Sequence, residues 1–151
     1  MDERAELIEA LTATPVIMRA LVRGISDEAA RDRGGERDWS VVELVAHLTD
    51  VDTRMAERVG IMVHEDRPVM SAYQADAAAE AGHFRSRSLA AALVAFESAR
   101  ETYVTALKAL SPEQWARTCR HETAGELSIQ QFTAHITAHD ASHLAQIARA
   151  I

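Results

Sequence analysis

Near the end of the chain lies the stretch His135-Ile136-Thr137-Ala138-His139-Asp140-Ala141-Ser142-His143-Leu144-Ala145-Gln146-Ile147, in which three histidines recur every four residues. In an α-helix a step of four residues climbs about 6 Å and turns about 40°, so neighbouring members of this series share a face. Two imidazoles one turn apart can bind a single transition metal. All three cannot, because the outer two lie roughly 12 Å apart along the axis. The stretch therefore predicts a helix that carries a pair of metal ligands.

The position of each histidine on this helix indicates which pair that is. The apolar residues that define the inner face are Ile129, Phe132, Ile136, Leu144 and Ile147. At about 100° per residue, His143 lies within this face, His139 at its edge and His135 about 40° further out. An inward imidazole needs a partner, and a metal supplies one. We therefore expect His139 and His143 to be ligands. His135 is expected either to lie behind the ligands or to line the mouth of a pocket, where it can accept a proton as a catalytic residue.

The composition limits the classes of protein that this chain can represent. A chain of 151 residues fits one domain over 1–151, and its low content of Gly, Pro and aromatic residues favours helix. A net charge of -7 argues against nucleic acid as the main partner. The sequence contains no run of about 20 apolar residues, so no membrane span is expected. The acidic N-terminus lacks the apolar core of a signal peptide. With a single cysteine, Cys119, the protein is expected to be cytoplasmic.

Helical periodicity predicts an all-α fold, a four-helix bundle. The expected long helices span about 2–24, 40–63, 88–110 and 128–151. The first is interrupted at Thr14-Pro15, where it is expected to kink or restart. Ser40 with Glu43 forms a capping box that opens the second helix, and an equivalent box opens the fourth at Ser128. The long second connection leaves room for a crossed topology, and residues 117–127 are expected to form a polar loop rather than strands.

A third metal ligand has to come from another helix. His47 lies at the border of the apolar stripe of the second helix, and Asp52 lies inside that stripe, an unusual place for a carboxylate. His64, His83 and His121 fall in predicted connections and are expected to be solvated.

These residues carry a resemblance to a known family. The pattern Trp39-Ser40, Glu43, His47-Leu48, Asp50, followed by His139 to Ile147, resembles the DinB/YfiT-like superfamily. The resemblance implies a four-helix bundle in which one histidine of the second helix and an HxxxH pair of the fourth bind a metal. It places His47, His139 and His143 at the ligand positions. Many members carry glutamate five residues after the first of these histidines, where this chain has the shorter Asp52.

Three neutral imidazoles leave positions on a divalent cation open, as in catalytic sites. Imidazole ligation suits zinc, nickel, copper or iron, and we expect zinc or nickel. The resemblance implies that the cation activates a low-molecular-weight thiol for transfer to an electrophile. We therefore expect a metal-dependent thiol S-transferase, or a hydrolase that uses water. The alternatives are a non-catalytic metal-binding or stress-related bundle, and a bundle that holds no metal.

Further residues are assigned to the neighbourhood of this site. Asp52 or Asp140 is expected to orient an imidazole by accepting its second N–H, which makes Asp52 a catalytic candidate beside His135. Arg85 and Arg87 either meet the carboxylates of a thiol or are solvated. The apolar faces of the first and third long helices predict a homodimer, as the resemblance also implies.

Overall fold

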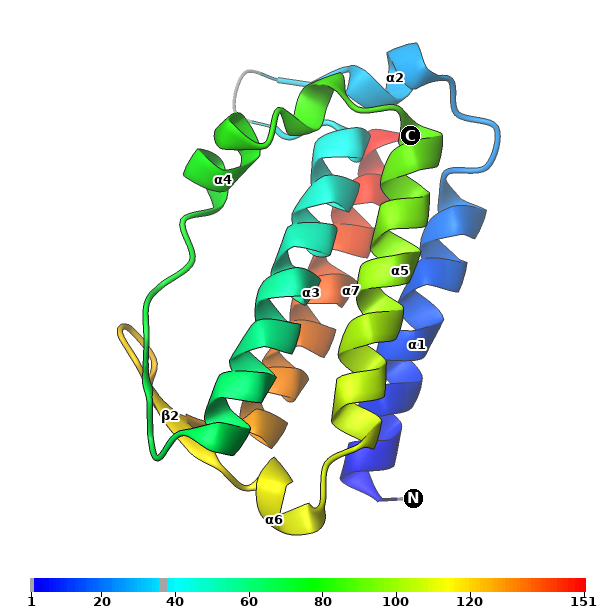
Figure 1. The fold of residues 1–151 in the computed structure, drawn as a ribbon. Helices are drawn as coiled ribbons and strands as arrows, with labels where there is room; N and C mark the ends of the chain where they lie inside the picture. The colour runs from blue at the N-terminus through cyan, green and yellow to red at the C-terminus, as the bar shows by residue number, and fades with distance from the viewer. Residues whose placement is uncertain (1, 36–37) are drawn as a thin grey trace.

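The computed structural model describes residues 2–35 and 38–151. Along the chain it has α1 (Glu3–Leu21), α2 (Asp27–Arg31), α3 (Val41–His64), β1 (Val69–Met70), α4 (Ala75–Ala81), the 3₁₀ turn η1 (Phe84–Ser86), α5 (Leu89–Lys108), α6 (Pro112–Trp115), β2 (Thr118–His121), β3 (Gly125–Ser128) and α7 (Ile129–Ala150). The four long helices α1, α3, α5 and α7 form the predicted bundle (Figure 1). Within the described ranges, none of the helices has the length and apolar character needed to cross a bilayer.

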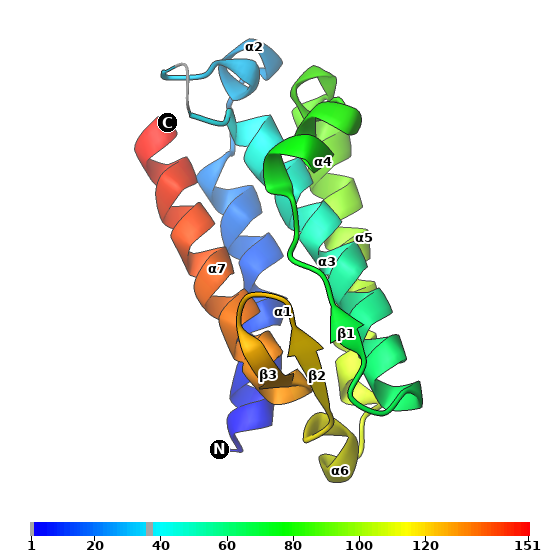
Figure 2. The ribbon, with the colours of Figure 1, turned by 90° about the vertical axis from the view of Figure 1, so that its left-hand side faces the viewer.

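The bundle has a crossed topology. Helices α1 and α7 run in one direction, and α3 and α5 run in the other (Figure 1). Helix α3 packs against α5 and α7, and α1 packs against the same two helices. The first two long helices of the sequence, α1 and α3, are therefore diagonal to each other. This arrangement requires the connection from α3 to α5, which passes through α4, to travel the length of the bundle, as predicted from its length (Figures 1 and 2).

Serine caps set the starts of the helices that carry the histidines. At α3 the Ser40 hydroxyl accepts from the Glu43 N–H at 3.3 Å, and the Glu43 carboxylate accepts from the Ser40 N–H at 3.1 Å. Ser128 and Gln131 make the same reciprocal pair at α7. Both predicted capping boxes are confirmed. Each fixes the register from which the helix presents its histidines.

The expectation that residues 117–127 form a loop without strands is wrong. Strands β2 and β3 pair antiparallel, and β1 adds in parallel beside β2, so a small three-stranded sheet lies against one end of the bundle (Figure 2). Cys119 of β2 is fully buried, and its side chain packs into the apolar core of the bundle. Strands of two to four residues have at most two side chains on each face, which is too short for an alternating pattern to stand out in the sequence.

A polar layer divides the core of the bundle. Two apolar clusters fill the halves of the bundle, one around Phe132 and Leu107 and the other around Phe96 and Leu48. Between them each long helix contributes one buried polar residue: Thr14, Asp52, Arg100 and Asp140. Buried polar groups at one level of a bundle are tolerated only when they satisfy one another.

Helix α1 continues through Pro15 without the expected break. Proline has no N–H, so the Leu11 carbonyl four residues earlier loses its helical partner. Arg100 replaces that partner, because its Nη1 donates to Leu11 O at 2.8 Å. Thr14 does not cap a new helix; its hydroxyl donates to Asp140 Oδ2 at 2.9 Å.

Candidate metal centre

Three imidazoles from two helices converge at one point in the bundle. His47 of α3 is 3% exposed, and its Nε2 lies 3.1 Å from Nε2 of His139 on α7. Nε2 of His143 lies 3.1 Å from the same His139 nitrogen. The three residues each offer one nitrogen within 4.8 Å of the others. The structure thus brings together the three residues that the sequence analysis selected as ligands.

The ring nitrogens that face one another test whether a cation fits this cluster. The His143 Nδ1–H donates to Gln146 Oε1 at 3.0 Å. In this tautomer Nε2 carries the lone pair, and Nε2 is the atom that faces His139. Nδ1 of His47 and Nδ1 of His139 are buried and, among the described residues, have no hydrogen-bond partner. Zinc–nitrogen bonds of about 2.0–2.1 Å in tetrahedral geometry place two ligand nitrogens about 3.3 Å apart, close to the two separations of 3.1 Å at His139. The donor set and its spacing fit a divalent transition metal.

The surroundings of His47 and His139 keep these two rings neutral. Burial, followed by the charges of the neighbouring His143 and His139, lowers the pKa of His47 to about 3. Burial, followed by the charge of His143, lowers the pKa of His139 to about 4. Neutral imidazole is the form that binds a metal, so at pH 7 both rings are ready to do so without losing a proton.

Two aromatic residues enclose His47. The Trp39 ring meets it edge-on at 4.9 Å between centroids, and the Tyr73 ring stacks on it at 5.7 Å. Tyr73 is held by its hydroxyl, which donates to Asp50, and by the Arg54 guanidinium 4.7 Å above its ring. Burial and the Asp50 carboxylate raise the pKa of Tyr73 above its ordinary value, so the phenol keeps its proton. These contacts fix the His47 ring in position.

A pocket of about 250 Å³ reaches this cluster at His139. His135 lines it, with its ring centroid 6.3 Å from that of His139, in agreement with the expected place at the mouth of a pocket. His121 lines it as well, from strand β2, although the sequence analysis had placed it in solvent. Its Nδ1 accepts from the backbone N–H groups of Thr123 and Ala124, which orients the ring.

Three further lining residues, Arg54, Arg58 and Tyr73, were not selected from the sequence. The two arginines did leave a signal there. They follow His47 by seven and eleven residues, which brings them within about 20° of it on the helix.

The position of Asp52 contradicts the catalytic role expected for it. Its side chain is fully buried, and both of its oxygens accept from Arg100, at 2.7 and 3.0 Å. Asp140 also pairs with Arg100, through both oxygens. Neither carboxylate is therefore the acceptor for an imidazole N–H that the sequence analysis expected. The physical reason is the buried guanidinium, which attracts both carboxylates into the polar layer.

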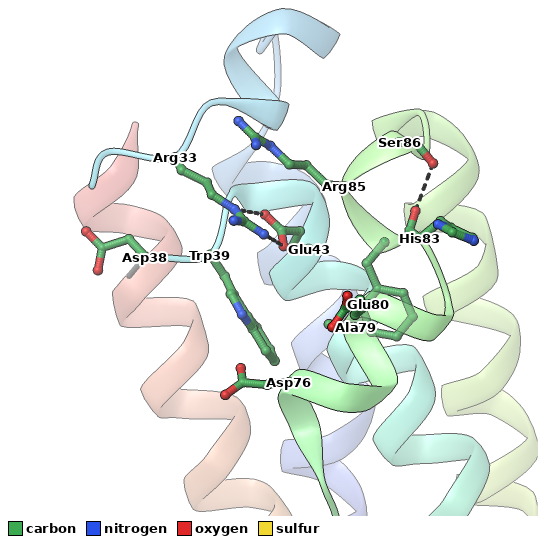
Figure 3. Close-up of a pocket in the computed structure, with 11 residues that line it drawn as sticks. Arg33, Asp38, Trp39, Glu43, Asp76, Ala79, Glu80, His83, Arg85 and Ser86 are labelled. Carbon is green, nitrogen blue, oxygen red and sulfur yellow. Dashed lines mark hydrogen bonds and ion pairs between the residues drawn. The ribbon is translucent and has the colours of Figure 1, made fainter. Parts of the chain in front are cut away.

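A larger cavity of about 770 Å³ lies at the end of the bundle beside α4 (Figure 3). Trp39 lines it and also contacts His47, but the ligand nitrogens do not line it. Its inner wall carries the ion pair of Arg33 with Glu43, whose carboxylate also serves the α3 cap. Arg85 lines this cavity rather than the pocket at His139, and Arg87 lies over the Phe84 ring. His83 lines it too, and His64 is exposed at the end of α3.

The protein is a crossed four-helix bundle whose second and last long helices bring three histidines together in a candidate metal site. The family model of the DinB superfamily matches residues 10–147, and the chain belongs to this superfamily. The resemblance noted in the sequence is thereby confirmed.

Similar proteins carry names that refer to a metal. A protein of Geobacillus thermodenitrificans named "Putative metal-dependent hydrolase" is 27% identical over 147 residues, which are 97% of this chain and 83% of that protein. A protein of the same description from Geobacillus kaustophilus is 26% identical over 147 residues, again 97% of this chain and 83% of the relative. Among solved structures, YfiT from Bacillus subtilis, described as "a probable metal-dependent hydrolase with an unusual four-helix bundle topology", matches with a TM-score of 0.88. It is 19% identical, with 97% of this chain and 85% of YfiT covered, and this likeness shows the fold.

Proposed function

We propose that the protein is a metal-dependent enzyme in which His47, His139 and His143 hold zinc or nickel and a low-molecular-weight thiol is the nucleophile. The observation that carries this proposal is the convergence of the three Nε2 atoms, together with the pocket that reaches the cluster at His139. The metal-dependent names of the relatives support it. With water in the place of the thiol, the same site would perform hydrolysis, the activity that those names describe.

The residues around the site have separate roles in the proposed reaction: one accepts a proton and two exclude water. A divalent cation, when bound, supplies Lewis acidity that lowers the pKa of a thiol or water to near neutrality. His135 accepts the proton, since it lines the same pocket and is exposed enough to pass the proton to solvent. Trp39 and Tyr73 cover His47 and keep water from that side of the site. The thiol sulfur then forms a bond to an electrophilic carbon, and the leaving group departs with its bonding electrons. A reducing cytoplasm, where such thiols stay reduced, is the compartment we propose.

The test uses protein loaded with zinc or nickel, N-acetylcysteine as the thiol and monochlorobimane as the electrophile. We expect the loaded protein to accelerate formation of the fluorescent adduct, and His143→Ala to return the rate to that of the uncatalysed reaction. His64→Ala is the control, because this histidine is exposed and lies outside the cluster. Hydrolysis of 4-nitrophenyl acetate without thiol measures the water reaction. Equal rates with wild type and His143→Ala would contradict the proposal and leave the non-catalytic metal-binding bundle.

The role of His135 is tested separately from metal binding. His135→Gln is expected to lower the rate by about 10²–10⁴, the usual contribution of a positioned acid–base group, without changing the metal content. Elemental analysis of untagged protein provides the second readout. Loss of metal in this variant would show that His135 supports the ligands, and an absence of metal uptake by wild type would favour the bundle without a metal.

A further inference from the structure

The pocket at His139 has a positive lining. Its charge comes from Arg54 and Arg58 of α3, which line it beside the imidazoles of His121, His135 and His139. No carboxylate is found among the described residues that line it. The cavity beside α4 differs, because four acidic residues line it together with its two arginines: Asp38, Glu43, Asp76 and Glu80 (Figure 3). The charge of the smaller pocket therefore favours an anion, and a bound divalent cation would strengthen that preference.

Of the two arginines that line this pocket, Arg58 is the one without an anionic partner among the described residues. It is half-buried, its Nη2 donates to Ser71 O at 2.7 Å, and the guanidinium lies 5.6 Å from the centre of the Phe132 ring. Among the described residues, no carboxylate forms an ion pair with it. Burial, followed in the same direction by the nearby Arg54, lowers the pKa of Arg58. An oxyanion that binds to a half-buried guanidinium without an ion pair stabilises the charge.

Other arginines of the bundle show what a satisfied guanidinium looks like here. Arg100 uses its donors on Asp52, Asp140 and a carbonyl. Arg33 pairs with Glu43. Arg54, the neighbour of Arg58 in the pocket, pairs with Asp50 at 3.3 Å and lies over Tyr73, so it adds positive charge while holding the wall. Arg58 therefore stands out as a guanidinium that is directed at the pocket and free to bind a ligand.

We propose that this pocket selects a small organic anion, whose carboxylate binds Arg58 while its reacting end lies toward His139. The inference rests on the proposed function for the reaction, but binding of the anion depends only on the pocket. A volume of about 250 Å³ lies below the range of pockets for drug-sized ligands, so the molecule is small. Arg58 is then a specificity-determining residue, and Arg54 raises the local potential.

The experiment measures binding by calorimetry, with succinate as the anionic probe and succinamide as its neutral analogue. Metal-free and zinc-loaded protein are both titrated. We expect succinate to bind to both forms, and succinamide to bind at least about tenfold more weakly. We expect Arg58→Gln to lower the affinity for succinate by about 10- to 100-fold, the usual effect of losing a hydrogen bond to a charged group. Arg149→Gln removes the same charge from an exposed site near the end of α7, and its affinity should equal that of wild type.

Two further measurements keep the result interpretable. Arg58→Lys retains the charge and is expected to recover part of the affinity, and circular dichroism shows whether each variant keeps its helices. Equal binding of succinate and succinamide, no succinate binding to wild type, or an unchanged affinity in a folded Arg58→Gln protein would each overturn the inference. Arg58-dependent binding to a protein that takes up no metal and turns over no thiol would instead leave the inference standing and refute the proposed function.

Discussion

At the scale of single residues, Arg100 is the most completely bonded side chain of the described core. It is 2% exposed, and its Nε and Nη2 donate to Asp52 at 2.7 and 3.0 Å. Nη1 and Nη2 donate to Asp140 at 2.6 and 3.0 Å, and Nη1 donates also to Leu11 O. All five N–H groups of the guanidinium are thereby used. A buried charge is tolerated in this position because no donor is left without an acceptor.

Arg100→Met is predicted to destabilise the protein strongly. The substitution leaves Asp52 and Asp140 as neighbouring buried carboxylates without their cation, and breaking a buried pair in this way costs about 3–5 kcal/mol. Urea unfolding followed by circular dichroism measures the change. Arg19→Met is the matched control, because Arg19 pairs with Glu97 on the surface, where such pairs contribute about 0–1 kcal/mol. A loss no larger than that of the control would show that the polar layer contributes little to stability.

His47 predicts how the stability of the metal-free protein depends on pH. Its pKa is about 3 in the folded protein, against an ordinary value of 6.5. Between these values the unfolded chain binds more protons, so the free energy of unfolding falls as the pH falls, by up to about 1.4 kcal/mol per pH unit for this group. Burial raises the pKa of Asp52 to about 6, which acts in the opposite direction between pH 6 and its ordinary value of 3.8.

A comparison of variants isolates the contribution of His47 from that of Asp52. Urea unfolding is measured from pH 7 to pH 4 for wild type and His47→Gln, both without metal. The variant should lose less stability on acidification, while His64→Gln, which alters an exposed histidine, should follow wild type. Parallel curves for wild type and His47→Gln would contradict the lowered pKa.

At the scale of elements, the cap of α3 connects local sequence to the metal site, since His47 follows Ser40 by seven residues. Ser40 and Glu43 are both buried, and Glu43 also pairs with Arg33. Ser40→Ala is predicted to cost about 1–2 kcal/mol of unfolding free energy. Ser26→Ala removes an exposed cap from the short helix α2 and should cost about 0.5 kcal/mol, the low end for such changes. Equal losses in thermal or urea unfolding would show that burial of the α3 cap adds nothing.

The elements also show how far the sequence could be interpreted. The four long helices were predictable because each has an apolar stripe, and α3, α5 and α7 also begin at a serine cap, whereas the cap of α1 is Asp2. The pair His139 and His143 was predictable because its spacing directs both side chains inward, and His47 because of the resemblance to the DinB/YfiT-like superfamily. The strands were not, since a four-residue strand has too short a pattern, and His121 was missed with them.

The polar layer was visible in the sequence only in part. Asp52 stood out inside an apolar stripe, but its partner did not, because a lone arginine in a helix ordinarily indicates a solvated surface. The polar layer has four members: Thr14, Asp52, Arg100 and Asp140. They can be recognised as a group only in the folded protein, where the crossed topology brings them to one level. Long-range pairing of this kind depends on helix order and direction, which periodicity does not contain.

At the scale of the whole molecule, the histidine cluster joins α3 to α7, two helices that are far apart in the sequence. A cation that binds only the folded state stabilises it by RT ln(1 + [L]/Kd), about 2.7 kcal/mol at one hundred times Kd. Zinc or nickel is therefore predicted to raise the melting temperature of wild type, and chelation to reverse the rise. His143→Ala should abolish the shift, whereas His64→Ala should keep it. A melting temperature that does not respond to either metal would exclude a specific site.

The outer face of α1 predicts how two molecules associate. Val16 is 73% exposed and Ile17 46%, and with Ile8 they line a shallow apolar hollow on this helix. We propose that a second copy of the chain covers it, because two-fold pairing through one shared patch is the commonest form of assembly. Val16→Glu would place two like charges in such an interface, so sedimentation should show dimers of wild type and monomers of the variant. Val69→Glu is the matched control, since Val69 is 68% exposed on β1 and lies outside this face. Monomeric wild type, or dissociation by both variants alike, would contradict pairing through α1.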